Sequence, residues 1–106
     1  MIIRIWHGRI NSSEAEAYRK FIFRSGIPDY LGTPGNKGAQ YWQKTEGEIT
    51  HVWTASWWDD LKSIEAFAGK DIEKAHYYEE DKKWLLEFEP RVVHYEVFNR
   101  DDIFPQ

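Results

Sequence analysis

Cysteine is absent from this sequence of 106 residues. Disulfide bonds, thiol catalysis and cysteine-based metal sites are therefore excluded. No apolar run approaches ~18 residues, the length that spans a bilayer, so we expect no membrane-spanning segment. The apolar first ten residues are interrupted by Arg4, His7 and Arg9, which argues against a signal peptide. Together these absences favour a cytoplasmic protein.

An excess of positive charge is also missing. The chain has 14 Lys and Arg against 18 Asp and Glu, a net charge of −4, and no basic stripe. This balance argues against nucleic-acid binding. The motifs of common catalytic sites are missing as well: there is no Ser-His-Asp or Cys-His constellation, no dinucleotide fingerprint, and no histidine pair at metal-ligand spacing. We therefore expect neither a metal site nor a bound cofactor.

Aromatic side chains are plentiful instead, at 17% of the residues. A hydrophobic fraction of 42% and a charged fraction of 30% are typical of a globular protein. We expect one domain over residues 1–98 and a polar tail over residues 99–106. Most of the aromatic side chains are expected in the core or in an interface, and only a few of them can border a ligand pocket.

Alternation of side chains predicts four strands, at residues 2–9, 39–45, 49–58 and 91–98. A short turn at residues 46–48 joins the second and third of them as a hairpin. A capping box of Ser13 and Glu16 predicts a helix that ends near Gly26, followed by a loop over residues 26–38. After the third strand, two aspartates predict the start of a second helix, which is interrupted at Gly69 and resumes at Asp71. Residues 79–83, EEDKK, are interpreted as a solvated stretch with local ion pairs.

This order, β-α-β-β-α-β, predicts an α+β fold of the ferredoxin-like class, a four-stranded antiparallel sheet with its helices on one face. We expect Trp6 and Trp58 on the other face. Four strands of about seven residues cover roughly 450 Å². That area is at or above the largest apolar patch of a typical monomer, so we predict a homodimer in which two sheets pack against each other.

A pocket is expected between the helices and the sheet. His7 shares its side of the first strand with Ile3 and Ile5, and His76 lies one helical turn after Ile72, so both histidines could face this space. One of them would act as a general base or orient a ligand, because histidine changes charge near neutral pH. The expected catalytic side chains are His7, His76 and Tyr77, and the expected pocket walls are Ile5, Trp57, Phe67 and Ile72. The alternative is that the two histidines are partly buried residues with backbone or tyrosine partners.

The chain resembles the antibiotic biosynthesis monooxygenase-like family of dimeric α+β barrels. The resemblance lies in MIIRIWHGR at residues 1–9, GIPDYLGTPGNKGAQ at residues 26–40, and SWWDDLKSIEAFAGKDIEKAHYYEEDKKWLLEFEPRVVHYEV at residues 56–97. It implies a ferredoxin-like subunit and a dimer. The family includes cofactor-free monooxygenases of aromatic compounds, haem-degrading enzymes and members without known activity.

The resemblance also implies where a site would lie. In the haem-degrading branch, the strand-one Asn corresponds to His7 here, the Trp to Phe67, and the ligand His to His76 or Tyr77, so two of the three positions depart from the pattern. In the quinone-forming branch, Trp57 and Tyr77 could correspond to pocket residues. We expect a cofactor-independent monooxygenase-type protein for a small aromatic or quinol-like compound. The alternatives are a non-catalytic ligand-binding or dimerisation module and a haem protein with His76 as axial ligand.

Overall fold

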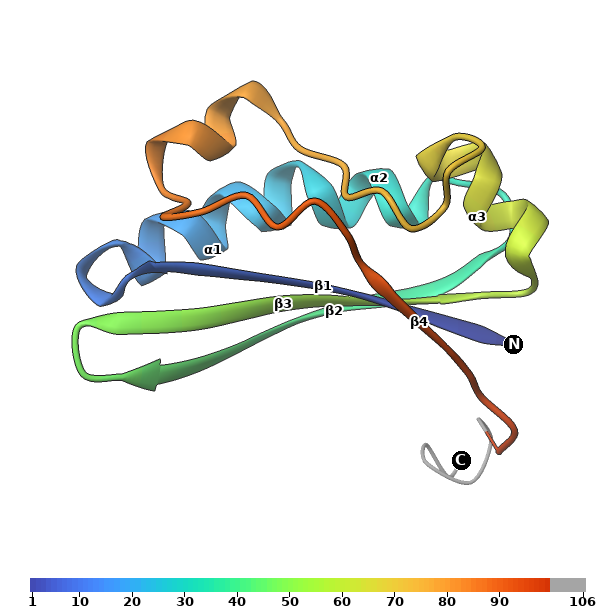
Figure 1. Cartoon of the computed structure of the whole chain (residues 1–106), viewed down its shortest axis with the longest axis horizontal. Helices are drawn as coiled ribbons and strands as arrows, with labels where there is room; N and C mark the ends of the chain where they lie inside the picture. The colour runs from blue at the N-terminus through green and yellow to red at the C-terminus, as the bar shows by residue number, and fades with distance from the viewer. Residues whose placement is uncertain (100–106) are drawn as a thin grey trace.

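The computed structural model describes residues 1–99 (Figure 1). The elements, in chain order, are β1 (Ile2–Asn11), η1 (Ser12–Glu14), α1 (Ala15–Arg24), α2 (Gly26–Leu31), β2 (Asn36–Glu46), β3 (Ile49–Trp58), α3 (Leu61–Ala68), η2 (Glu79–Lys83) and β4 (Val93–Glu96). Of the tail expected at residues 99–106, residues 100–106 lie outside the described part of the chain. None of the helices within residues 1–99 is both long and apolar enough to cross a bilayer.

The four strands form one sheet with the order β2-β3-β1-β4, and each neighbouring pair is antiparallel. Residues 36–46 and 49–58 form the expected hairpin around Gly47, whose φ of 63° suits glycine. The helices and the segment that carries η2 all lie on one side of the sheet (Figure 1). This arrangement confirms the prediction of a ferredoxin-like α+β fold.

The helix after β3 begins as its sequence predicts. The Asp60 carboxylate accepts hydrogen bonds from the backbone N–H and the hydroxyl of Ser63, both at 2.8 Å. These contacts satisfy a donor at the helix start that has no partner within the helix. Gly69 follows the last turn with φ of 87°, a conformation that favours glycine, and ends α3.

Other local predictions are wrong. No helix resumes at Asp71: residues 69–78 are irregular, and their backbone pairs with the segment before β4, with Ala75 N–H donating to Pro90 O and Val92 N–H donating to Glu73 O. These tertiary hydrogen bonds replace those of a helix. The loop expected at residues 26–38 contains α2 instead, and α1 begins at Ala15 with no side-chain cap.

The assignment of the two sheet faces is also wrong. Arg4, Trp6 and Trp58 face the helices, and their side chains are at most 7% exposed. The other alternating set of β1, which includes Ile5 and His7, therefore lies on the open face. Both alternating sets of β1 contain apolar residues. The alternation therefore shows which side chains share a face, but it does not show which of the two faces the helices cover. Burial of the Trp rings outweighs the cost of burying Arg4, whose guanidinium donates to Lys74 O at 3.0 Å.

Candidate functional site

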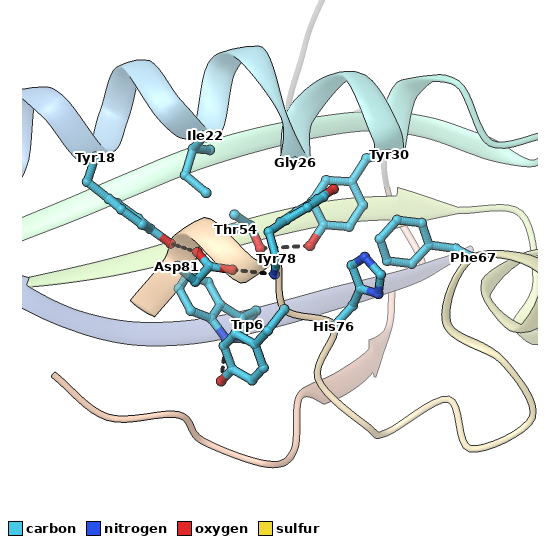
Figure 2. Close-up of a pocket in the computed structure, with 11 residues that line it drawn as sticks. Trp6, Tyr18, Ile22, Gly26, Tyr30, Thr54, Phe67, His76, Tyr78 and Asp81 are labelled. Atoms are coloured by element: carbon cyan, nitrogen blue, oxygen red, sulfur yellow. Dashed lines mark hydrogen bonds between the residues drawn. The ribbon is translucent and has the colours of Figure 1, made fainter. Parts of the chain in front are cut away.

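A cavity of about 30 Å³ lies between the helices and the sheet (Figure 2). Its walls come from β1, β3, α1, α2, α3, the irregular segment after α3, and η2. The residues that line it are Trp6, Tyr18, Ile22, Gly26, Tyr30, Thr54, Phe67, His76, Tyr77, Tyr78 and Asp81. A volume of this size holds about one water molecule.

Trp6 and Tyr77 form one polar corner of the cavity. The indole N–H of Trp6 donates to the Tyr77 hydroxyl oxygen at 3.1 Å, and that hydroxyl donates to Glu89 O at 2.5 Å. The two rings meet edge to face, with their centroids 6.1 Å apart. Burial raises the pKa of Tyr77, so its hydroxyl stays protonated and keeps both hydrogen bonds near neutral pH.

Asp81 supplies a buried carboxylate that sequence reasoning missed. Its side chain is 3% exposed, accepts from the Tyr78 backbone N–H at 2.7 Å, and lies 3.4 Å from the Tyr18 hydroxyl. Burial raises the pKa of Asp81, and the hydrogen bonds from Tyr78 and Tyr18 oppose that effect. Asp81 lies within the run EEDKK, whose charges resemble a solvated surface. The signal that could have found it is its place three residues after Tyr78, where a side chain caps a helical turn.

His76 lies at the mouth of the cavity and is exposed. Its ring centroid is 5.5 Å from that of Phe67 and 5.2 Å from that of Tyr78. Phe67 in turn stacks on Tyr30 at 4.8 Å, and the Tyr30 hydroxyl shares a hydrogen bond with Thr54 at 3.0 Å. Figure 2 shows His76 and Phe67 side by side at one end of the cavity and Tyr18 with Asp81 at the other. The structure therefore brings together three of the predicted site residues: Phe67, His76 and Tyr77.

The prediction that His7 faces the same space as His76 is wrong. His7 lies on the open face, where its Nδ1 contacts the Glu89 carboxylate and its Nε2 lies 2.9 Å from His51 Nδ1. Its neighbour Ile5 is on that face too, and both line a groove of about 490 Å³ together with Trp42, Trp53, Glu89, Arg91, Val93 and Tyr95. His7 and Ile5 lie on the same face because side chains two positions apart in a strand point to the same side of the sheet, so an alternating set changes sides as a whole.

Trp57 and Ile72 do not border the helix–sheet cavity either. Trp57 lies opposite Ile3 in the β1–β3 register and shares the open face with it. Ile72 is partly buried and packs against the core beside the cavity. Within residues 1–99, no group of three or more His, Asp and Glu side chains is arranged to hold a metal ion.

The cavity combines aromatic walls with three kinds of polar group: an exposed imidazole, a buried carboxylate and tyrosine hydroxyls. Such a set can stack on a flat ring, accept a proton from it and keep bulk water away. Polar contacts inside the cavity are stronger than in water, because the surroundings are largely apolar.

Comparison with known proteins gives a likeness in fold. No family model matches the chain, and no curated protein matches it. Among solved structures, the chain is similar to a protein from Nitrosomonas europaea described as a "putative antibiotic biosynthesis monooxygenase", with a TM-score of 0.64 and 17% sequence identity. The match covers 92% of this chain and 98% of that chain. It agrees with the resemblance drawn from the sequence, and the chain therefore shares the ferredoxin-like α+β fold of that protein.

Proposed function

We propose that the chain binds a small aromatic or quinol-like compound in the helix–sheet cavity and acts on it as a cofactor-independent monooxygenase. One observation carries the proposal: a half-open cavity with a histidine at its mouth and six aromatic side chains in its walls, which are Trp6, Tyr18, Tyr30, Phe67, Tyr77 and Tyr78. The description of the Nitrosomonas europaea protein as a "putative antibiotic biosynthesis monooxygenase" supports the same type of reaction.

The proposed reaction requires few protein groups. In an anthrone-like compound, a CH₂ group lies between two activated rings, and removal of one proton gives a resonance-stabilised anion. This anion reduces O₂ itself: the CH₂ becomes C=O, the second oxygen atom leaves as water, and all four electrons come from the substrate. His76 would accept the proton as general base. The aromatic walls would orient the ring, and packing of the ring against them would exclude solvent from the faces that they cover.

A ring-sized substrate requires the cavity to expand from about 30 Å³. His76 and Tyr78 belong to the irregular segment at residues 69–78, whose backbone is held by hydrogen bonds to the segment before β4. The Tyr78 hydroxyl donates to the Asp29 carboxylate, a bond that opening would have to break. A shift of these two side chains would open the mouth. The small volume is also the observation that favours the second candidate function, a non-catalytic module whose cavity is packed core.

Oxygen uptake with a panel of anthrones and quinols tests the proposal. We expect uptake by the wild-type protein and a loss of about 100-fold or more in His76→Ala, the size typical of a lost general base. His51→Ala is the matched control, because it removes a histidine from the open face and should leave the rate unchanged. Absence of uptake across the panel would favour the non-catalytic module.

Titration with haemin separates the haem alternative. Ligation by a histidine would produce a Soret band that is lost in His76→Ala. A Soret band that persists in this variant would exclude His76 as the axial ligand.

We further propose that the protein is a homodimer joined through its open sheet face. Val93 and Tyr95 are 50% and 56% exposed there, and Trp42 is 39% exposed. The four strands contain 35 residues. At ~3.3 Å of rise and ~4.8 Å of strand spacing they cover about 550 Å², so two faces together reach roughly 1,100 Å². A specific interface needs about 1,000 Å² or more.

Light scattering after size exclusion measures this state. The expected mass is twice the chain mass of 12.7 kDa, falling toward the single-chain value in Tyr95→Lys. A wild-type mass of one chain at micromolar concentration would contradict the dimer.

A further inference from the structure

Arg4 is a buried cation with most of its hydrogen-bonding capacity unused. Its side chain is 2% exposed, and one guanidinium nitrogen donates to Lys74 O at 3.0 Å. Its Nε and Nη1 atoms are buried and have no hydrogen-bond partner, and no carboxylate of residues 1–99 lies within ion-pair distance of Arg4. Arginine keeps its charge in such surroundings, so the missing anion is costly.

His94 carries a second unpartnered polar atom at the same place in the sheet. Arg4 and His94 lie directly opposite each other in the β1–β4 register, so their side chains share one side of the sheet. His94 Nε2 is buried and has no partner. Burial, reinforced by the Arg4 charge, lowers the pKa of His94, so its imidazole is neutral near neutral pH. Two neighbouring strands thus present a fixed positive charge and a neutral imidazole side by side.

This pair of residues adjoins the cavity. The Arg4 guanidinium carbon lies 5.6 Å from the centre of the Phe67 ring, and Phe67 is a wall of the cavity. Trp6, two residues further along the same face of β1, is another wall. In Figure 2, Phe67 lies at one end of the cavity, beside His76. The Phe67 ring therefore borders both the cavity and the Arg4 guanidinium, and its rotation would expose Arg4 to the cavity.

We propose that Arg4 and His94 form the inner end of the ligand pocket and bind the oxyanion of an aromatic ligand when Phe67 turns aside. This inference rests on the proposed function and deepens it by naming the substrate class as aromatic oxyanions, such as phenolates, enolates and carboxylates. The ligand oxygen accepts from the free Arg4 N–H groups, and a His94 tautomer with hydrogen on Nε2 adds a further donor. The space vacated by the Phe67 ring would add to the cavity of about 30 Å³, which by itself is too small for an aromatic ring.

Binding of two matched probes tests the inference without any turnover. 2-Naphthoate and 2-naphthylmethanol share a ring system, and only the first is an anion at neutral pH. Tryptophan fluorescence or calorimetry should give tighter binding of the naphthoate by the wild-type protein. Arg4→Met should weaken naphthoate binding by roughly tenfold or more, the worth of a charge-assisted hydrogen bond, and leave binding of the alcohol unchanged.

Two further variants complete the test. Arg9→Met removes a positive charge from the open face of the same strand and should bind both probes as the wild type does. Phe67→Ala removes the barrier and should tighten naphthoate binding more than binding of the alcohol. Because Arg4→Met eliminates an unpaired buried charge, its melting temperature should be at least that of the wild type.

The inference is overturned if the wild type binds neither probe, or binds both equally. It is also overturned if Arg4→Met binds naphthoate normally, or if Phe67→Ala gains nothing for the anion. The Phe67→Ala measurement tests the inference even if Arg4→Met fails to fold. Oxygen uptake separates the two proposals. Charge-selective binding without oxygen uptake contradicts the monooxygenase activity and supports the oxyanion site. Oxygen uptake without charge-selective binding supports the monooxygenase activity and contradicts the oxyanion site.

Discussion

Replacement of Gly8 by alanine should destabilise the protein and shift Trp6, although alanine usually suits a strand better than glycine does. A Cβ atom on Gly8 would lie 2.6 and 2.7 Å from two carbons of the Trp6 ring and 3.2 Å from a methyl carbon of Leu85. Carbon atoms in ordinary contact are about 3.5–4.0 Å apart. The absent side chain of Gly8 is therefore what allows the Trp6 ring to lie over the strand and line the cavity.

The magnitude follows from these distances. The Trp6 ring must move by about 1 Å to restore normal contact. Such a shift weakens its 3.1 Å hydrogen bond to Tyr77. Overpacking of this kind costs about 1–3 kcal/mol, and the gain of up to about 1 kcal/mol from replacing a strand glycine offsets only part of it. A net loss of ~1–2 kcal/mol corresponds to a fall of roughly 4–16 °C in melting temperature for a domain of this size.

Thermal unfolding followed by circular dichroism measures the loss, and tryptophan emission reports the shift of the ring. Gly26→Ala is the matched control, because its Cβ would meet only an Ile22 methyl carbon at 3.8 Å, an ordinary contact. It should leave the melting temperature unchanged or raise it. Addition of Trp6→Phe to Gly8→Ala should recover part of the loss, because the smaller ring leaves room for the new methyl group. A Gly8→Ala protein that melts with the wild type and keeps its emission spectrum would refute the reasoning.

Two further substitutions probe carboxylates that the structure uses in opposite ways. Burial raises the pKa of folded Asp81 above its unfolded value of about 3.9, so its contribution to the free energy of unfolding is lost as pH rises through the folded pKa. Asp81→Asn should therefore raise the melting temperature at about pH 7 and have no effect near pH 3, and the opposite pH trend would contradict the burial argument. Asp60→Ala removes the cap of α3 and should lower the melting temperature, whereas Asp59→Ala, which removes only an exposed ion pair, should change it little. Because hydrogen bonds to Ser63 lower the pKa of Asp60, this effect of Asp60→Ala should fade in acid as the Asp60 carboxylate becomes protonated, which a pH series of melting curves would measure.

Local patterns in the chain predicted the elements that depend on local physics. Alternating residues identified the strands, and the acids after Trp58 identified the start of α3, because a carboxylate beside free N–H groups caps a helix wherever it occurs. The grouping of Phe67, His76 and Tyr77 was also expected, since all three lie in or just after the interrupted helix predicted to follow the third strand. These features need few distant contacts.

Burial was harder to predict, because it depends on partners far away in the chain. Arg4 is inside the fold because Lys74 O accepts from it across 70 residues, and Asp81 is buried because Tyr18 and Tyr78 surround it. Charged side chains are rarely buried unless they have a partner, so a prediction from residue type alone places Arg4 and Asp81 at the surface. Both of these residues became candidates for function only once their surroundings were known.

By itself, the sequence determined the four strands in their order, the hairpin around Gly47 and the cap at Asp60, because each depends on residues within a few positions of one another. Only the tertiary structure decided which face of the sheet the helices cover. A strand has two sets of side chains related by a period of two, and the packing of the whole fold selects the inner one. That selection sends His7 to the open face and leaves Arg4 beside the cavity.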